Sequence, residues 1–70
     1  MMRPGKMVKK RQGFLAGGIP LDSTGLIVNG PYLKILKLSP KAQAETFVVD
    51  VLVDGVVYEE IPIAELEIVK

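Results

Sequence analysis

The sequence predicts a small all-β domain built from five antiparallel strands, and three observations lead to this fold class. Residues 46–61, TFVVDVLVDGVVYEEI, are rich in β-branched and aromatic residues and are interrupted once, by Asp54-Gly55. A two-residue Asp-Gly loop favours a type I′ turn, so this segment predicts a tight hairpin. Residues 32–38 lie between two prolines and are too few for an ordinary helix. Because an isolated hairpin is barely stable, at least three further strands are expected from the rest of the chain.

The first part of the chain predicts a basic arm followed by a long loop. Residues 1–13 include Pro4 and glycines, and they predict a flexible arm, separate from a barrel domain over residues 14–70. Met7 and Val8 can begin the first strand. The basic residues of the arm are Arg3, Lys6, Lys9, Lys10 and Arg11. The next segment, residues 14–25, contains Gly17-Gly18 and predicts a long irregular loop. Its apolar anchors are Phe14, Leu15, Ile19 and Leu21.

The middle of the chain predicts two short strands before the hairpin. Residues 26–28 form an apolar strand, and a turn signal follows them at residues 29–31. Residues 32–38 read as a second strand, and residues 39–45, SPKAQAE, read as a polar connector.

The first hairpin strand is apolar on both of its faces. Side chains alternate along a strand, so Val48 and Leu52 point away from the side of Val51. Apolar residues on both faces indicate that the barrel core covers one side and a neighbouring chain covers the other. The predicted core residues are Leu26, Val28, Phe47, Val49, Val51, Val53 and Leu66.

The end of the chain predicts a strand, a short turn and a final strand. Pro62 lacks a backbone donor and ends the return strand, on which Val57 and Ile61 share a face opposite Tyr58. Residues 64–66 suit one 3₁₀ turn, and residues 67–69 suit the last strand.

Composition limits how such a domain is stabilised. Seventy residues make a single domain with a small core. The chain has no cysteine and no histidine, which excludes disulfides and an ordinary zinc site. An apolar fraction of 49% exceeds what a solitary domain of this size needs, and it favours association with other chains. No apolar run has the length of a membrane span, and no signal peptide is recognisable, so an intracellular protein is expected.

Charge is distributed unequally along the chain. Residues 1–41 contain eight basic residues and one acidic residue, a net charge of +7. Residues 42–70 contain seven acidic residues and one basic residue, a net charge of −6. This dipolar pattern can steer a partner of either sign, and it also suits contact between the basic part of one copy and the acidic part of another.

The sequence does not predict catalysis. Serines and threonines have no histidine or cysteine partner, and Glu59 and Glu60 face opposite ways on a strand. Gly17-Gly18 is not followed by the residues of a phosphate-binding loop. We therefore predict no catalytic residues, no metal site, no cofactor and no small-molecule substrate.

Three segments form recognisable motifs: GLIV at residues 25–28, VLVDG at residues 51–55 and IPIAELEI at residues 61–68. These motifs resemble the SH3-like small barrels found among short virion proteins of tailed phages, cyanophages included. The order of the predicted elements, with its long first loop and its 3₁₀ turn before the last strand, also resembles this barrel. The resemblance covers about residues 25–69, and its motifs concern the fold. It implies a virion or assembly-associated binding module.

The expected function is that of a non-enzymatic structural or adaptor subunit in a larger assembly, such as a phage capsid, neck or tail. Its expected location is the virion or the host cytoplasm, neither secreted nor in a membrane. Its partners are other proteins, copies of itself among them. The alternative is nucleic-acid binding through the basic arm. The candidate partner-binding residues are Arg3, Lys6, Lys9, Lys10, Arg11, Phe14, Tyr32, Val48 and Leu52.

Overall fold

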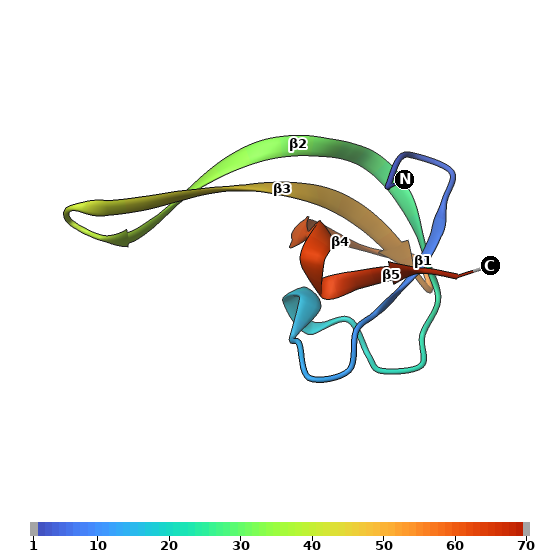
Figure 1. Ribbon diagram of the computed structural model, residues 1–70. Helices are drawn as coiled ribbons and strands as arrows, with labels where there is room; N and C mark the ends of the chain where they lie inside the picture. Colours follow the sequence, from blue (N-terminus) through green and yellow to red (C-terminus); the bar gives the residue numbers. More distant parts are fainter. Residues whose placement is uncertain (1, 70) are drawn as a thin grey trace.

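The computed structural model describes residues 2–69 as a strand-rich domain with two short 3₁₀ turns (Figure 1). The strands are β1 (Met7–Lys10), β2 (Gly25–Ser39), β3 (Ala42–Val53), β4 (Val56–Pro62) and β5 (Leu66–Ile68). The 3₁₀ turns are η1 (Ala16–Gly18) and η2 (Ile63–Glu65). Within these residues no helix is long and apolar enough to cross a membrane.

All five strands belong to one antiparallel sheet in the order β4-β3-β2-β1-β5. The predicted all-β class and five antiparallel strands are therefore confirmed. The strands at the two ends of this order, β4 and β5, do not pair with each other, so the sheet is not closed. Figure 1 shows a strongly bent sheet, in which β1, β4 and β5 gather at one end of the long β2–β3 hairpin.

The predicted β3–β4 hairpin is confirmed. Val53 pairs with Val56, so Asp54 and Gly55 alone form the loop. Both loop residues have positive φ angles, 49° and 81°, as a type I′ turn requires. Pro62 is the last residue of β4, again as predicted.

The core lies between the curved sheet and the segment that carries η1. Along β3, Val49, Val51 and Val53 alternate into it, as the period of a strand requires. The buried residues of the core cluster are Val8, Ala16, Ile19, Ile27, Val49, Val51, Val53, Ile61 and Leu66.

Three of the predicted core residues are not buried in the structure. Leu26 is half-buried, Val28 is 43% exposed and Phe47 is 51% exposed. Gly25 and Ile27 face the core, so ordinary strand alternation places Leu26 and Val28 on the other face of β2, opposite to the prediction. Phe47 lies one residue beyond Val48, where the pairing of β3 with β4 begins.

The chain does not turn at residues 29–31 as predicted, because β2 continues through them with irregular pairing to β3. The predicted connector at residues 39–45 is also shorter than expected. Only Pro40 and Lys41 separate the two strands, and residues 42–45 belong to β3. Both differences lengthen the β2–β3 hairpin.

The predicted faces of β4 change at a bulge. Val49 pairs with Ile61 and Val51 pairs with Tyr58, so three steps along β4 match two steps along β3. Glu60 has a φ of 58° and occupies this irregularity. Tyr58 therefore packs against the core together with Ile61, instead of facing away from it.

Met7 and Val8 begin the first strand, as predicted: Met7–Lys10 form β1 between β2 and β5, so these four residues belong to the sheet and not to a flexible arm. Val8 is buried in the core. Repulsion within the basic segment is relieved because Lys9 forms an ion pair with Glu67 of β5, at 3.4 Å. Met1 lies outside the described residues.

Candidate interaction surfaces

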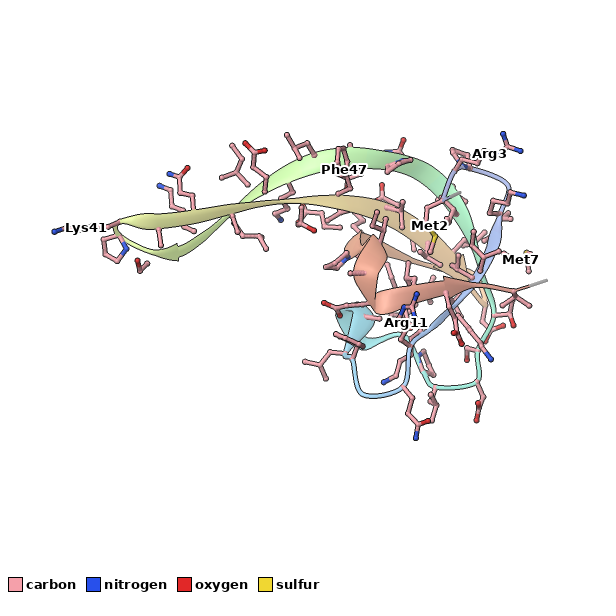
Figure 2. The ribbon with its side chains drawn as sticks, in the orientation of Figure 1. Met2, Arg3, Met7, Arg11, Lys41 and Phe47 are labelled. Carbon is pink, nitrogen blue, oxygen red and sulfur yellow. The ribbon has the colours of Figure 1, made fainter. Side chains whose placement is uncertain are left out.

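The far part of the β2–β3 hairpin, residues 33–47, forms a two-stranded ribbon outside the body of the domain. β4 pairs with β3 only from Val48 onward, and β1 pairs with β2 only at Gly25 and Leu26. Figure 1 shows this ribbon projecting away from the other elements. Figure 2 labels Lys41 at its far end and Phe47 closer to the body. The ribbon strands are thus unpaired along their outer edges within the described chain.

One face of the ribbon carries a cluster of exposed apolar side chains. Leu33 pairs directly with Phe47, and Ile35 lies two residues further along β2, so the three side chains share a face. They are 49%, 51% and 55% exposed, respectively. Contiguous apolar side chains of this kind mark interaction sites on soluble proteins.

The ribbon is also basic. It contains Lys34, Lys37 and Lys41 against one acidic residue, Glu45. Lys34 forms an ion pair with Glu60 of β4. Lys37 and Lys41 are exposed and form no ion pair within residues 2–69. Glu45 pairs with Ile35 and shares its face, so a partner of the ribbon meets an apolar strip with one carboxylate beside Ile35 and positive charge toward the tip.

A second apolar surface is a hollow of about 600 Å³ between the loop that follows β1 and the end of β4. Leu15 is 82% exposed and Phe14 is largely exposed beside it. Glu65 is the one ionisable residue in the lining. The lining residues are Gly13, Phe14, Leu15, Gly17, Gly18, Pro62 and Glu65.

The wall of the hollow is held in place by contacts between distant parts of the chain. The backbone N–H of Ala16 donates to Glu65 Oε1 at 2.8 Å, and the backbone N–H of Arg11 donates to the Glu65 carbonyl at 2.8 Å. Gly17 has a φ of 64° and packs against Ile61, where a Cβ atom would clash with Ile61 Cδ1. The hollow is therefore preformed by packing and hydrogen bonds.

Asp50 lies on the face of β3 that points away from the core, and its carboxylate accepts three hydrogen bonds. The donors are Tyr32 Oη at 2.8 Å, Asn29 Nδ2 at 3.2 Å and the backbone N–H of Glu60 at 3.0 Å. Partial burial acts to raise the pKa of Asp50, but these three donors outweigh it and lower that pKa. The hydrogen bond to Asp50 in turn raises the pKa of Tyr32 to about 12.

The predicted partner-binding residues are dispersed in the structure. Val48 is only 1% exposed, opposite Tyr32 and Pro62 in the sheet, so its predicted role in docking is wrong. Leu52 is half-buried. Phe14 lines the hollow, while the phenol of Tyr32 is bound to Asp50.

The basic candidates lie on β1 and on the residues directly before and after it. Lys9 is paired with Glu67, and Arg11 Nε donates to the Leu66 carbonyl at 3.0 Å. Lys10 lies beside Lys9, and Arg3 and Lys6 belong to a turn that precedes β1.

The ribbon was missed by sequence reasoning, although its signal was present. The sequence predicts a barrel strand for Leu33 and Ile35 and a core position for Phe47. The apolar run at residues 32–38 comes shortly before residues 42–47, and this sequence of two adjoining runs is the feature that indicates a long hairpin.

The structure offers no evident metal site among residues 2–69, since no three potential ligands of the His, Cys, Asp and Glu types come together there.

Comparison with known proteins gives no match to a family model, a curated protein or a solved structure.

Proposed function

We propose that this chain is a non-enzymatic subunit of a larger assembly and binds partner protein through its ribbon. The observation that carries this proposal is the exposed cluster of Leu33, Ile35 and Phe47 on one ribbon face. Covering three half-exposed side chains of this size contributes roughly 1 kcal/mol each, or roughly 3 kcal/mol in total. The ribbon projects beyond the other elements of the described chain (Figure 1), and the three side chains remain about half exposed.

The finer fold that we propose is an SH3-like small barrel. Three features support it: the long loop between β1 and β2, the two-residue β3–β4 turn, and the 3₁₀ turn before β5. β1 lies between β2 and β5 in the sheet, which brings the two ends of the chain together. With the resemblance of residues 25–69 to short phage proteins, these features favour a virion subunit of a capsid, neck or tail. Fold alone does not assign a function, so the ribbon remains the functional observation.

The test compares two variants expressed in the source cells. Ile35→Lys places a charge on the apolar ribbon face, and Leu21→Lys makes the same change at a side chain that is also about half exposed but lies on the loop before β2. In velocity sedimentation the wild type and Leu21→Lys should migrate with a large complex, whereas Ile35→Lys should migrate as free chain. A wild-type protein found wholly as free chain would refute the assembly role.

A second candidate function, nucleic-acid binding, is supported by one observation on the same ribbon. Lys37 and Lys41 lie outside any ion pair of residues 2–69, and the aromatic ring of Phe47 is exposed. Positive charge combined with an exposed aromatic side chain suits single-stranded nucleic acid. Against this candidate, Lys9 and Arg11 of the predicted basic arm are already bound within the domain.

A further inference from the structure

The irregular parts of the sheet gather where the ribbon meets the body of the domain. The register of β2 against β3 shifts between Ile27 and Asn29, and it shifts again between Asn29 and Tyr32. β4 has one shift against β3, which Glu60 occupies, and it ends opposite Val48. Such irregularities interrupt the ladder of backbone hydrogen bonds and bend a strand. The direction of the ribbon is therefore set at this junction.

Side-chain contacts bridge the junction. Asp50 of β3 accepts hydrogen bonds from the side chains of Asn29 and Tyr32 on β2 and from the backbone N–H of Glu60 on β4. One carboxylate thus joins three adjacent strands. Lys34, near the start of the ribbon, forms an ion pair with Glu60. These five residues are named the junction clamp.

The rest of the ribbon has no such contacts. Among the described residues, no side-chain hydrogen bond or ion pair joins residues 35–47 to a residue outside the ribbon. β4 and β1 do not pair with the ribbon strands either. A two-stranded ribbon has little stability of its own, so the contacts at its base determine its angle to the body.

We propose that the junction clamp fixes the direction of the ribbon, so that Leu33, Ile35 and Phe47 meet a partner in a single orientation. This inference rests on the proposed function, since it concerns the surface through which the chain binds its partner. A direction fixed before binding reduces the entropy that association loses, which raises the affinity without adding a contact. Without the clamp, the ribbon turns as a unit about residues 29–32.

Two variants weaken the clamp and preserve the apolar packing of the junction. Tyr32→Phe removes only the hydroxyl group, and its ring can remain opposite the buried Val48. Asp50→Asn keeps the size of the side chain and removes the charge that accepts three hydrogen bonds. Each change should reduce the population of the fixed direction on the order of tenfold, because a hydrogen bond to a charged group contributes at least this factor.

The chain offers a matched control for each variant. Tyr58→Phe and Asp54→Asn make the same chemical changes outside the clamp. Neither side chain forms a hydrogen bond among the described residues. Both controls should therefore leave the direction of the ribbon unchanged.

The direction is measured as the distance between two spin labels on the purified full chain. The sequence contains no cysteine, so Lys41→Cys at the ribbon tip and Val57→Cys on β4 provide two exposed labelling sites (Figure 2). Double electron–electron resonance should give one narrow distance distribution for the labelled parent chain and for both controls. The distributions of Tyr32→Phe and Asp50→Asn should be broad, under conditions in which circular dichroism shows that each variant is folded. A narrow distribution in both folded variants, or a broad one in the parent chain, overturns the clamp.

Sedimentation in source cells connects the clamp to partner binding. Tyr32→Phe should weaken association with the large complex on the order of tenfold, whereas Tyr58→Phe should not. If Tyr32→Phe has a broad distance distribution and still associates fully, the link between ribbon direction and partner binding is wrong. If the wild type is free in source cells while its narrow distribution depends on Tyr32 and Asp50, the assembly role fails and the clamp stands.

Discussion

The phenol of Tyr32 on β2 donates a 2.8 Å hydrogen bond to Asp50 Oδ1 on β3. The same carboxylate accepts from Asn29 and from the backbone N–H of Glu60, so it joins the irregular parts of β2 and β4 through the strand between them. Glu60 has a positive φ, which costs free energy for a residue other than glycine, and the hydrogen bond to Asp50 helps to hold it. Asp50 is thus a structural centre on the face opposite the core.

The first prediction concerns alkaline pH. The hydrogen bond to Asp50 raises the pKa of Tyr32 from 10.0 to about 12, so folding favours its protonated form. The resulting stability is fully present below pH 10 and is lost as the pH rises toward 12. Tyr32→Phe should remove the phenolate absorbance step near pH 12 and reduce the loss of stability in this window. Asp50→Asn leaves Tyr32 in place, and it should shift that step to lower pH; a step that stays near pH 12 contradicts the assigned cause.

The second prediction concerns acid pH. Three hydrogen bonds lower the pKa of Asp50 in the folded protein below its ordinary value of 3.8. A depressed carboxyl pKa contributes stability that is present above the unfolded value and is lost as the pH falls through the folded one. The melting temperature of Asp50→Asn should therefore lie below that of the wild type at neutral pH, and the two should converge in acid. A constant difference at every pH would show that the carboxylate charge is not involved.

The third prediction compares the same valine-to-alanine change at a buried position and at an exposed one. Val51 is fully buried in the core, whereas Val56 is 54% exposed on β4. Val51→Ala leaves a cavity and should lower the free energy of unfolding by about 1–3 kcal/mol. Val56→Ala removes the same two methyl groups and should cost much less. Urea unfolding measures both, and similar losses for the two variants would place Val56 in a buried environment.

The fourth prediction concerns Gly55, whose φ is 81°. No atom lies within 4 Å of a Cβ built there, so any penalty for a side chain comes from the backbone conformation alone. Gly55→Val should be clearly less stable than Gly55→Asn, because asparagine tolerates this region and a β-branched residue does not. Equal melting temperatures are incompatible with the type I′ turn.

The fifth prediction tests the nucleic-acid candidate. If the basic segment binds nucleic acid, replacing Lys9, Lys10 and Arg11 with alanine should weaken retention on DNA and reduce its dependence on salt. Replacing Lys37 and Lys41 provides the comparison at the ribbon. If the wild type is not retained on single- or double-stranded DNA at low salt, this candidate is eliminated.

Local chemistry determined much of this fold. The type I′ turn follows from Asp54-Gly55, since only a few residue types accept positive φ at both loop positions. The end of β4 follows from Pro62, which cannot donate to a strand pair. The core face of β3 follows from alternation, which places Val49 and Val51 on the same side.

Tertiary structure alone decided where the candidate surfaces lie. The period of a strand assigns Phe47 to the same face as Val49, but it does not say whether another element covers that face. β4 ends opposite Val48, and so Phe47 is exposed on the ribbon. The bulges at Val28 and Glu60 arise because paired strands carry unequal numbers of residues between matched positions. That inequality belongs to the pairing of two strands, so neither strand's own sequence contains it.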